Sequence, residues 1–311
     1  MKAFVLAAGF GTRLSPFTLH LPKPLMPLLN VPAILYTFAL LKEAGITEII
    51  CNIHHHASEI RSSMESFALE GLAVSFSEEK TILGTGGGLK KCERLLDEGD
   101  FLLINSDIVT NIDFASFINR HRESGLSGTL ALYETPEAAT IGNVGVKNGQ
   151  VMDFRNMRNT GLDSSLIYTG TAILSPEIFR HLKEEFSSIV DTGFTGLIEH
   201  GGLGAFRHTG SWIDIGTPWN YLNANTGLNM LPERLSPGIR DIIGIEPHRI
   251  SADASISPSA TVVRSVAGPG CIIGKGAVVV NTVLLPGALV EEGELLSNCI
   301  RDRHHSVFLP Q

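Results

Sequence analysis

Residues 6–25 read LAAGFGTRLSPFTLHLPKPL and begin inside a short apolar run. The run predicts a buried first strand over residues 2–8, and Gly9 and Gly11 come directly after it. Glycine lets the backbone come close to a ligand and aim its N–H groups at an anion. The third glycine of a dinucleotide fingerprint is replaced by Leu14, and the Gly-Lys-Ser/Thr of a Walker loop is absent. The stretch therefore predicts a phosphate-binding loop of another kind.

Two cations in this loop suit a phosphate ligand. Arg13 offers a planar fork for phosphate oxygens, and Lys23, held between Pro22 and Pro24, is a compact point charge. The whole chain is acidic, because 24 Lys and Arg against 32 Asp and Glu give a net charge of −8. An acidic surface repels nucleic-acid backbones and anionic lipid, so we expect neither as a main partner. A small anion can still bind where Arg13 and Lys23 concentrate positive charge.

Beyond the loop, short apolar runs alternate with helical patterns as far as residue 135. We predict strands over residues 2–8, 46–53, 72–76 and 101–105, a helix opened by Asn30 and Pro32 and closed by Gly45, and helices over 58–69, 84–96 and 113–124. Alternation at this spacing is typical of an α/β fold with a Rossmann-like, mostly parallel sheet and helices on both faces. Ligands of such folds bind at the carboxyl ends of the strands.

The chain divides into a large first domain and a small tail. Its length of 311 residues suggests about two domains. Residues 126–174 are strand-rich, with Asn148-Gly149 as a hairpin turn, and a helical stretch over 218–228 follows. Prolines and a glycine then mark a linker. We predict a first domain over 1–232, a linker over 233–248 and a tail over 249–311.

The tail carries a six-residue apolar repeat. Its members are Val266, Ile272, Val278, Leu284, Val290 and Leu296, and Ile250, Ile256 and Val262 share the period with a shorter step before Val266. Small residues lie four positions after most of them. One apolar and one small inward position per hexad describe a β-helix with three hexads to a coil, so nine hexads predict about three coils. The alternative, a β-sandwich, would show two-residue alternation.

The loop as a whole resembles the signature of the sugar-1-phosphate nucleotidyltransferases, or NDP-sugar pyrophosphorylases. Their pattern G-x-G-T-R-L-x-P-x-T-x-x-x-P-K-P-L is matched at every fixed position from Gly9 to Leu25. Further family motifs are resembled, in order, by Leu83-Gly84-Thr85-Gly86-Gly87, Asn105-Ser106-Asp107, Tyr168-Thr169-Gly170 and the stretch from Trp212 to Pro218. The resemblance covers about residues 1–230 and implies a GT-A-like nucleotidyltransferase domain. Several branches of the family also carry a short left-handed β-helix.

The resemblance implies transfer of a nucleotidyl group from a nucleoside triphosphate to a sugar-1-phosphate, with Mg²⁺ as cofactor. It implies that Arg13 and Lys23 act in catalysis and that Asp107 and Asp214 hold the metal. The residues implied in nucleotide binding are Leu6, Ala8, Gly9, Gly11, Thr12, Glu79, Gly84, Thr85 and Gly86. Those implied in sugar-phosphate binding are Asn105, Arg155, Arg158, Gly170 and Thr171. The attacking phosphate is already an anion, so the enzyme must mainly bring two polyanions together and neutralise their charge.

One motif departs from the family pattern. The family commonly shows F-x-E-K-P before the sugar-contacting turn, with the Lys on the sugar's phosphate. Here Phe154 is kept, but Asn156 and Met157 occupy the Glu and Lys positions. Arg155 or Arg158 could supply the missing cation, and the identity of the sugar stays open.

Three functions are compatible with these residues. The nearest pattern is similar to that of mannose-1-phosphate guanylyltransferases, and uridylyl or thymidylyl transfer to another hexose- or amino-sugar-1-phosphate is the close alternative. A regulatory subunit that binds a nucleotide sugar without turnover is the second alternative, although it should have lost Arg13, Lys23 or a metal-binding Asp. The third function is that of a bifunctional enzyme whose β-helix adds acyl transfer, but three coils offer little room for an acyl-CoA site. Self-association through the first domain or the β-helix is left open.

The remaining signals concern location and structural residues. The longest apolar run, residues 31–41, is too short for the roughly 20 residues of a membrane span. The four cysteines are far apart without a C-x-x-C, so we expect neither a disulfide framework nor a zinc site. The apolar run over residues 3–8 is too short for a signal peptide, so we expect a cytoplasmic protein with reduced thiols. The triplet His54-His55-His56 follows a predicted strand and lacks the ligand spacing of a metal site. Asp113 is expected to cap the helix that it opens.

Overall fold

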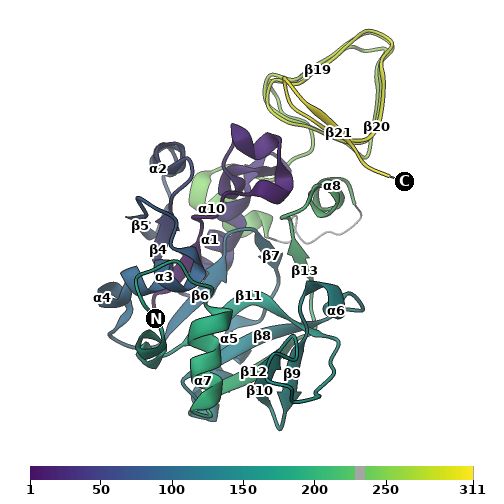
Figure 1. Ribbon diagram of the computed structural model, residues 1–311. Coiled ribbons are helices and arrows are strands. Elements are labelled where there is room, and N and C mark those ends of the chain that lie inside the picture. The colour runs from purple at the N-terminus through teal and green to yellow at the C-terminus, as the bar shows by residue number, and fades with distance from the viewer. Residues whose placement is uncertain (228–234, 311) are drawn as a thin grey trace. The chain divides into compact units, whose positions relative to one another are not determined.

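The computed structural model describes residues 1–227 and 235–310, which form two compact units (Figure 1). The first unit comprises residues 1–9, 40–65 and 71–212, and the second comprises residues 10–39, 66–70 and 213–311. The predicted boundary at residues 232–233 and the residue Leu228 lie outside the described residues. The predicted linker contains a helix, α10 (Ser236–Ile243).

A nine-stranded sheet in the order β5-β4-β1-β6-β11-β8-β12-β10-β9 forms the centre of the first unit. Four parallel strands make one half: β5 (Ala73–Glu78), β4 (Glu48–Ile53), β1 (Ala3–Leu6) and β6 (Phe101–Asn105). The other half contains β11 (Leu166–Leu174), β8 (Gly128–Glu134), β12 (Leu203–His208), β10 (Gln150–Phe154) and β9 (Val144–Lys147). β11 runs antiparallel to both β6 and β8. The predicted α/β fold with a mostly parallel, mixed sheet is confirmed.

Local sequence signals account for several elements of this unit. Asp113 caps α5 (Phe114–Ser124), because its Oδ1 accepts the Ser116 N–H at 3.0 Å. Asn148 and Gly149 both have positive φ and join β9 to β10, as the predicted hairpin requires. The remaining elements are α2 (Ala57–Ser66), α3 (Gly84–Lys91), α4 (Glu93–Leu96), β7 (Ile108–Thr110), α6 (Ala138–Ile141), the 3₁₀ helix η4 (Pro176–His181), the π-helical turn η5 (Val190–Phe194) and α7 (Thr195–Glu199).

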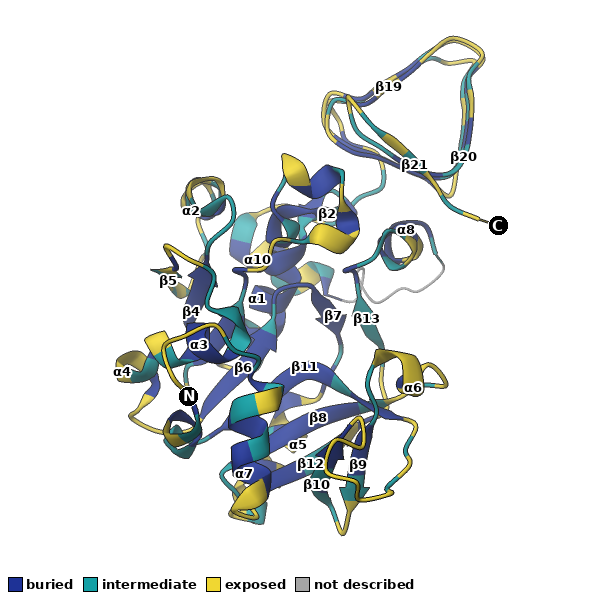
Figure 2. Ribbon diagram, viewed as in Figure 1, coloured by how far each residue is buried: buried dark blue, intermediate teal, exposed yellow. Residues whose placement is uncertain are grey.

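The central strands are buried on both faces, as their dark blue colour in Figure 2 shows. One face packs into a cluster in which Leu103 and Ala172 of the sheet meet Leu89 of α3 and Phe194 of η5. Full burial explains why these strands read as continuous apolar runs rather than as alternating ones. The buried apolar residues of β1 and β6 stop at the carboxyl ends of these strands, and polar residues such as Ser106 and Asp107 follow there.

The second unit combines the signature loop with the tail. The loop forms three 3₁₀ turns, η1 (Thr12–Leu14), η2 (Phe17–Leu19) and η3 (Lys23–Leu25), followed by β2 (Pro27–Leu28) and β3 (Val31–Pro32). Helix α1 (Ala33–Glu43) begins in this unit and ends in the first. Helix α8 (Pro218–Thr226) packs against the tail strands. Asn30 Nδ2 donates to the carbonyl oxygen of Ala267 at 3.2 Å, which ties the end of the loop to the tail.

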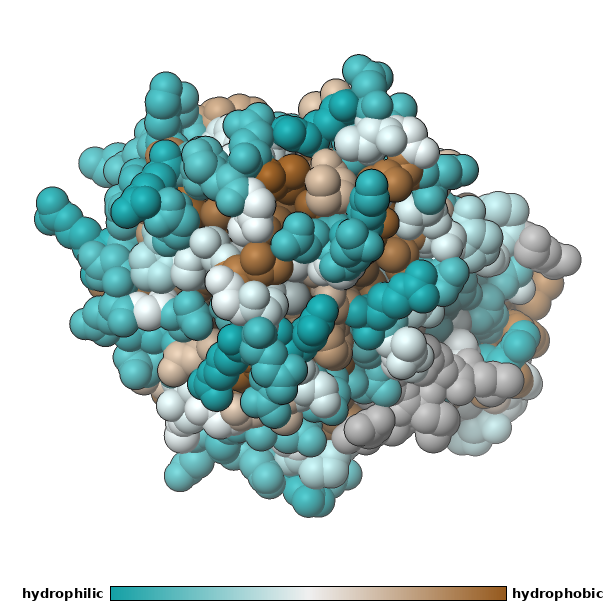
Figure 3. Space-filling view, turned by 90° about the horizontal axis from the view of Figure 1, so that it is seen from below, coloured by the Kyte–Doolittle hydropathy of each residue, from teal (hydrophilic) through white to brown (hydrophobic). Residues whose placement is uncertain are grey.

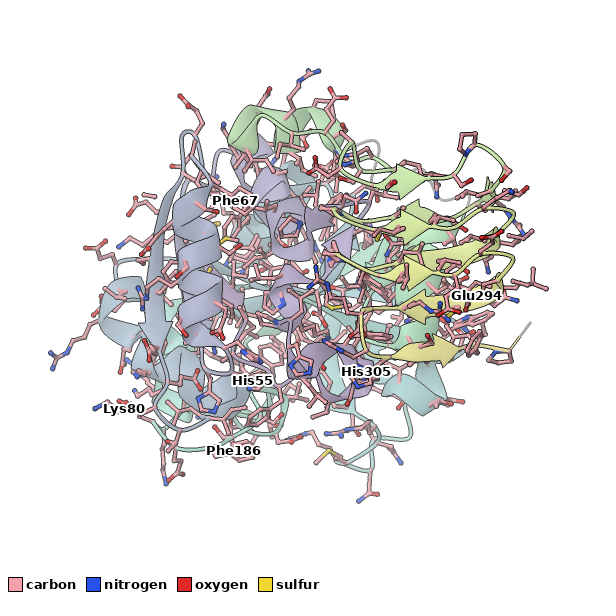
Figure 4. The ribbon with its side chains drawn as sticks, turned by 90° about the horizontal axis from the view of Figure 1, so that it is seen from above. His55, Phe67, Lys80, Phe186, Glu294 and His305 are labelled. Carbon is pink, nitrogen blue, oxygen red and sulfur yellow. The ribbon has the colours of Figure 1, made fainter. Side chains whose placement is uncertain are left out.

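The tail is a parallel β-helix whose coils stack in register. In Figure 4 its strands lie one below another, with Glu294 and His305 labelled on the later coils. Ser255, Ile272 and Leu289 form one column, with neighbours 17 residues apart. The strands are β14 (Ser255–Ile256), β15 (Thr261–Val263), β16 (Val266–Ala267), β17 (Ile272–Ile273), β18 (Val278–Leu284), β19 (Leu289–Val290), β20 (Leu295–Arg301) and the antiparallel β21 (Ser306–Phe308).

The coil length corrects the predicted inward register. Ile273 and Val279 are buried in the β-helix core, whereas Ile272 is 52% exposed, so the expectation that Ile272 and Val278 point inward is wrong. Buried residues on consecutive sides of the β-helix are six positions apart, except at one step, from Val279 to Leu284, which spans five. A strict six-residue repeat therefore falls out of step by one residue in each 17-residue coil. The inward positions Leu284, Val290 and Leu296 are confirmed. Glycines with positive φ, such as Gly270 and Gly287, lie at turns between the strands of the β-helix.

The face of the molecule shown in Figure 3 is mostly hydrophilic. On the face shown in Figure 3, hydrophobic residues lie near the middle and are interrupted by hydrophilic side chains. Among the described residues, no helix has the length and apolar character that crossing a bilayer requires.

Candidate active site

The carboxyl ends of β1 and β6 lie side by side in the first unit. Leu6 of β1 is paired with Asn105 of β6, and the Ser106 N–H donates to the Leu6 carbonyl oxygen at 3.1 Å. Asp107 follows at once and is 9% exposed. A Cβ added to Gly9 would meet no atom within 4 Å, so the backbone there borders open space. The structure thus places Leu6, Gly9, Asn105 and Asp107 at the carboxyl ends of two central strands, where ligands of this fold class bind.

A buried Asn–Glu pair braces the end of β1. Asn52 is 1% exposed; its Oδ1 accepts the Ala7 N–H at 2.8 Å, and its Nδ2 donates to Glu79 Oε1 at 2.7 Å. Glu79 Oε2 accepts the Leu83 N–H at 2.7 Å, just before α3. Two loops predicted to bind the nucleotide are therefore joined through one side-chain pair. Sequence analysis missed Asn52, although a polar residue inside an apolar strand was a signal for it.

The glycines at the start of α3 make room for protein backbone. A Cβ on Gly84 would lie 2.4 Å from the Ser187 carbonyl oxygen, and one on Gly87 would lie 2.1 Å from that of Glu185. The Gly86 N–H donates to the Ser187 carbonyl oxygen at 2.9 Å, and Thr85 Oγ1 accepts the Ile189 N–H at 2.8 Å. The segment over residues 185–189 is thereby fastened to α3. A role of Gly84, Thr85 and Gly86 in nucleotide binding stays a prediction.

β11 is bulged beside the end of β6. Its register to β8 shifts between Tyr168 and Ala172, and Gly170 has a φ of 81°. A Cβ on Gly170 would lie 2.8 Å from Asn105 Nδ2, so only glycine admits the Asn105 amide at this distance. The Trp212 indole N–H donates to the Thr169 carbonyl oxygen at 2.9 Å. The bulge thus brings together Asn105 and Gly170, both predicted to bind the sugar-phosphate, and Trp212, which was not among the predicted site residues.

The two arginines proposed for the missing lysine are both paired with carboxylates. Arg155 Nη2 lies 2.8 Å from Asp191 Oδ1 on η5, and Arg158 Nη1 lies 3.2 Å from Glu199 Oε1 at the end of α7. Both arginines lie on the turn after β10. Asp153 accepts the backbone N–H groups of Arg158 and Thr160 and thereby holds this turn. Asp191 was not found from the sequence, because nothing near Arg155 in the chain points to it.

In the second unit, Arg13, Lys23 and Asp214 converge on Gly216. A Cβ on Gly216 would lie 2.6 Å from Arg13 Nη2, Lys23 Nζ and Asp214 Oδ1 alike. Arg13 Nη1 is 3.5 Å from Asp214 Oδ2, and the Gly216 N–H donates to Asp214 Oδ1 at 2.7 Å. Two cations and a carboxylate thus surround one bare backbone position. This arrangement suits an anionic ligand that approaches with a metal ion.

The carboxylates fit a divalent metal of the hard class. Among the described residues, no group of three or more His, Cys, Asp or Glu is arranged to hold a metal ion. Mg²⁺ is usually held by one or two carboxylates, with substrate phosphates and water completing its shell, so Asp107 in the first unit and Asp214 in the second are each a suitable type of ligand. That the two hold one ion stays a prediction. The Arg13 and Lys23 side chains beside Asp214 would meet the phosphates of such a complex.

Other chemically active residues have structural partners. His54 Nδ1 lies 2.7 Å from the Glu79 carbonyl oxygen, and His56 Nδ1 lies 3.1 Å from Glu59 Oε1. Burial raises the pKa of the Cys51 and Cys92 thiols, which makes them poor nucleophiles. His55, labelled in Figure 4, stacks edge-on against His56.

The chain is similar to known proteins over most of its length. The sequence profile of the family described as nucleotidyl transferase matches residues 2–230. Mannose-1-phosphate guanyltransferase 2 of Candida glabrata is 32% identical over 84% of this chain and 72% of its own length. Mannose-1-phosphate guanyltransferase beta-B of Xenopus laevis is 31% identical over 79% of this chain and 72% of its own length. The crystal structure of HddC from Yersinia pseudotuberculosis superposes with a TM-score of 0.61 at 25% identity, covering 72% of this chain and 97% of that one.

Proposed function

Since the chain belongs to the nucleotidyl transferase family and transfers a nucleotidyl group to a sugar-1-phosphate, we propose that it is a guanylyltransferase acting on mannose-1-phosphate. The activity named for the relatives from Candida glabrata and Xenopus laevis supports this substrate pair. The observation that carries the proposal is the cluster of Arg13, Lys23 and Asp214 around Gly216. It supplies the positive charge that a transferring α-phosphoryl group requires.

The proposed reaction is an in-line displacement. An oxygen of the sugar phosphate attacks the α-phosphorus of the triphosphate, and the bond from that phosphorus to pyrophosphate breaks. No general base is needed, because a phosphate monoester is largely a dianion at neutral pH. Positioning and charge neutralisation therefore supply the rate enhancement.

We assign the chain's residues to these tasks. Arg13 binds phosphate oxygens with its planar fork, and Lys23 neutralises charge as pyrophosphate departs. Backbone N–H groups of the loop from Ala8 to Thr12 approach the triphosphate. The Asn52–Glu79 pair holds the end of β1 in place for this contact.

The sugar-phosphate is assigned to Asn105, Gly170 and Arg155. The Asn105 amide lies over Gly170, and we assign it to a sugar hydroxyl. The Asp191 carboxylate engages Nη2 of Arg155, and we assign other N–H groups of that guanidinium to the phosphate. Asp107 and Asp214 would hold Mg²⁺, whose chemistry is to neutralise phosphate charge and align the reacting oxygens. A cytoplasmic location and self-association stay predictions.

The decisive experiment is a substrate matrix. Pyrophosphate release is measured with the four nucleoside triphosphates against several sugar-1-phosphates in the presence of Mg²⁺. The proposal expects the highest kcat/KM with GTP and mannose-1-phosphate. A preference for UTP or dTTP with another sugar would replace the substrate assignment, and nucleotide-sugar binding without turnover would favour a regulatory subunit.

Two aspartates that follow β6 make a matched test of the metal assignment. Asp107→Asn should lower kcat by at least about 100-fold, because a metal-binding carboxylate is lost. Asp113→Asn replaces a residue whose contacts are those of a helix cap and should leave kcat within about threefold. Equal activity of the two variants would remove Asp107 from the site.

A further inference from the structure

Three histidine rings meet where the tail reaches the signature loop. His20 follows η2 in the loop, and His304 and His305 follow β20 in the last coil of the tail. The His20 ring is stacked on that of His305, with centroids 6.3 Å apart, and it lies edge-on to that of His304, with centroids 6.2 Å apart. Both separations are within the range of aromatic ring contacts. The loop and the tail belong to one compact unit, so this contact lies inside that unit.

A short turn presents the two tail histidines to the loop (Figure 4). Asp302 Oδ1 accepts the backbone N–H of His304 at 2.7 Å and that of His305 at 2.6 Å. The Asp302 N–H in turn donates to the His305 carbonyl oxygen at 3.0 Å. Arg301, the residue before the turn, is paired with Glu294 at 2.7 Å. The turn is therefore fixed to the last coil, and its imidazoles are held in one place.

The loop is fastened to the tail at a second point. Asn30 Nδ2 donates to the carbonyl oxygen of Ala267, in the first coil, at 3.2 Å. Ala267 is paired with Leu284 and Leu284 with Arg301, so the first and the last of these lie in one column of the β-helix, two strand spacings apart. Neighbouring strands are about 4.8 Å apart, so the column separates its ends by about 10 Å. The segment over residues 20–30 is therefore held at both of its ends by the stack of coils.

This segment carries Lys23 and is joined to the rest of the phosphate loop. Thr18 of η2 donates from Oγ1 to the Gly11 carbonyl oxygen at 2.9 Å. A Cβ on Gly11 would lie 3.0 Å from both Lys23 Cβ and Thr18 Cγ2, so these residues are in close contact. Arg13 follows Gly11 after one residue, in η1. A movement of His20 and η2 is therefore passed to both cations of the loop through direct contacts.

We propose that His304 and His305 of the tail are positioning residues of the reaction, which hold His20 and thereby keep Arg13 and Lys23 in place for the substrate phosphates. The inference rests on the proposed nucleotidyl transfer and gives the tail a part in it. The imidazoles act through the loop and not on a reacting atom. A contact shifts the loop between positions by no more than its own free energy, so the effect on the rate has the size of one or two ring contacts.

His20→Ala removes the ring that both tail histidines contact, and because His20 is exposed the variant should fold. We expect kcat to fall about 3- to 10-fold, since a loosened loop holds its cations in place for a smaller fraction of the time. The KM for the sugar-1-phosphate should stay within about twofold, because Asn105 and Gly170 lie in the first unit. Backbone hydrogen exchange over residues 10–30 should be faster than in the wild-type protein.

Two further variants separate the ring contact from other roles of His20. His20→Phe keeps a ring and should restore at least about half of the wild-type kcat. Adding His304→Ala and His305→Ala to His20→Ala should lower kcat no further, because all three substitutions remove the same contact. A fall in kcat that His20→Phe does not restore, or that the tail substitutions deepen as if independent, would refute the inference.

Leu295→Ala is the matched control. Leu295 begins β20, is 70% exposed and is paired with Val278, in another column from the one that ends at Arg301. Its substitution should leave kcat and the hydrogen exchange of the loop unchanged. If His20→Ala also leaves both unchanged, the inference is refuted while the proposed function stands. If the wild-type protein turns over no sugar-1-phosphate, the proposed function fails, and the role in the reaction fails with it even where hydrogen exchange shows that the tail holds the loop.

Discussion

Gly216→Ala tests whether the convergence of charges at Gly216 is what drives catalysis. The new methyl group would lie 2.6 Å from Arg13 Nη2, Lys23 Nζ and Asp214 Oδ1. Ordinary van der Waals contact begins near 3.4 Å, so each of these groups must retreat by about 0.8 Å. The φ of Gly216 is not in the left-handed region, so alanine adopts this backbone without strain.

The expected effect on activity is large and that on folding is small. A misplacement near 1 Å of groups that position reactants costs about 100-fold in rate, which corresponds to about 2.7 kcal/mol of transition-state stabilisation. The ends of Arg13 and Lys23 are flexible and can move into solvent. Alanine also lowers the entropy of the unfolded chain by an amount worth about 0.4–1 kcal/mol. We therefore expect the free energy of unfolding to change by no more than about 1 kcal/mol.

The assay is steady-state pyrophosphate release together with urea denaturation. Gly99→Ala serves as the control, because a Cβ there meets no atom within 4 Å and the backbone has no positive φ. It should leave kcat/KM unchanged and raise the free energy of unfolding by no more than about 1 kcal/mol, the effect of alanine on the unfolded chain. If Gly216→Ala keeps kcat/KM within about threefold of wild type with an unchanged urea midpoint, the charge cluster does not act in the rate-limiting step. If Gly216→Ala lowers the free energy of unfolding by more than about 3 kcal/mol, alanine does not fit this position without strain.

Three further predictions concern charge, bracing and pH. Arg13→Lys should lower kcat/KM by about 10- to 100-fold, since lysine keeps the charge and loses the planar fork; steady-state kinetics measure this, and wild-type kcat/KM would show that charge alone suffices. Asn52→Ala should lower the free energy of unfolding by about 2–4 kcal/mol, because it removes the partner of buried Glu79 Oε1 and of the Ala7 N–H. Urea denaturation measures this, and a fall of less than about 1 kcal/mol would mean that water replaces the amide. Burial raises the pKa of Asp153, but hydrogen bonds from the Thr160 hydroxyl and backbone N–H groups outweigh it and bring the pKa below 3.8. The unfolded state then binds the proton more tightly, so this carboxylate stabilises the fold above about pH 4 and the contribution is lost as the pH falls through the folded pKa; Asp153→Asn should flatten the acid limb of a stability–pH profile, and an unchanged limb would exclude Asp153 as its source.

Local signals in the chain were sufficient for the elements and the family motifs. The Asn148-Gly149 turn, the Asp113 cap and the alternation of strands and helices depend on neighbours within a few residues, so the sequence shows them directly. The signature from Gly9 to Leu25 is equally contiguous, and it carries the phosphate-binding cations. The reaction class is therefore predictable from the amino-acid sequence.

Contacts between distant residues were decided by the tertiary structure alone. Asn52 meets Glu79 across two strands, and Asp191 meets Arg155 across 36 positions of the chain. The α3 glycines were expected to approach a ligand, and the structure shows that they admit the backbone over residues 185–187. No periodicity reports such pairings, because they depend on how the strands are ordered in the sheet.

The β-helix shows the same division within one repeat. Its six-residue period and its glycine corners are sequence properties, because each corner needs a residue that tolerates positive φ. Which residue of each side points inward depends on the 17-residue coil, and the coil length follows from the stacking of one coil on the next. The sequence alone determined the architecture and the chemistry of its motifs, and packing between distant segments decided the register and the partners of each polar group.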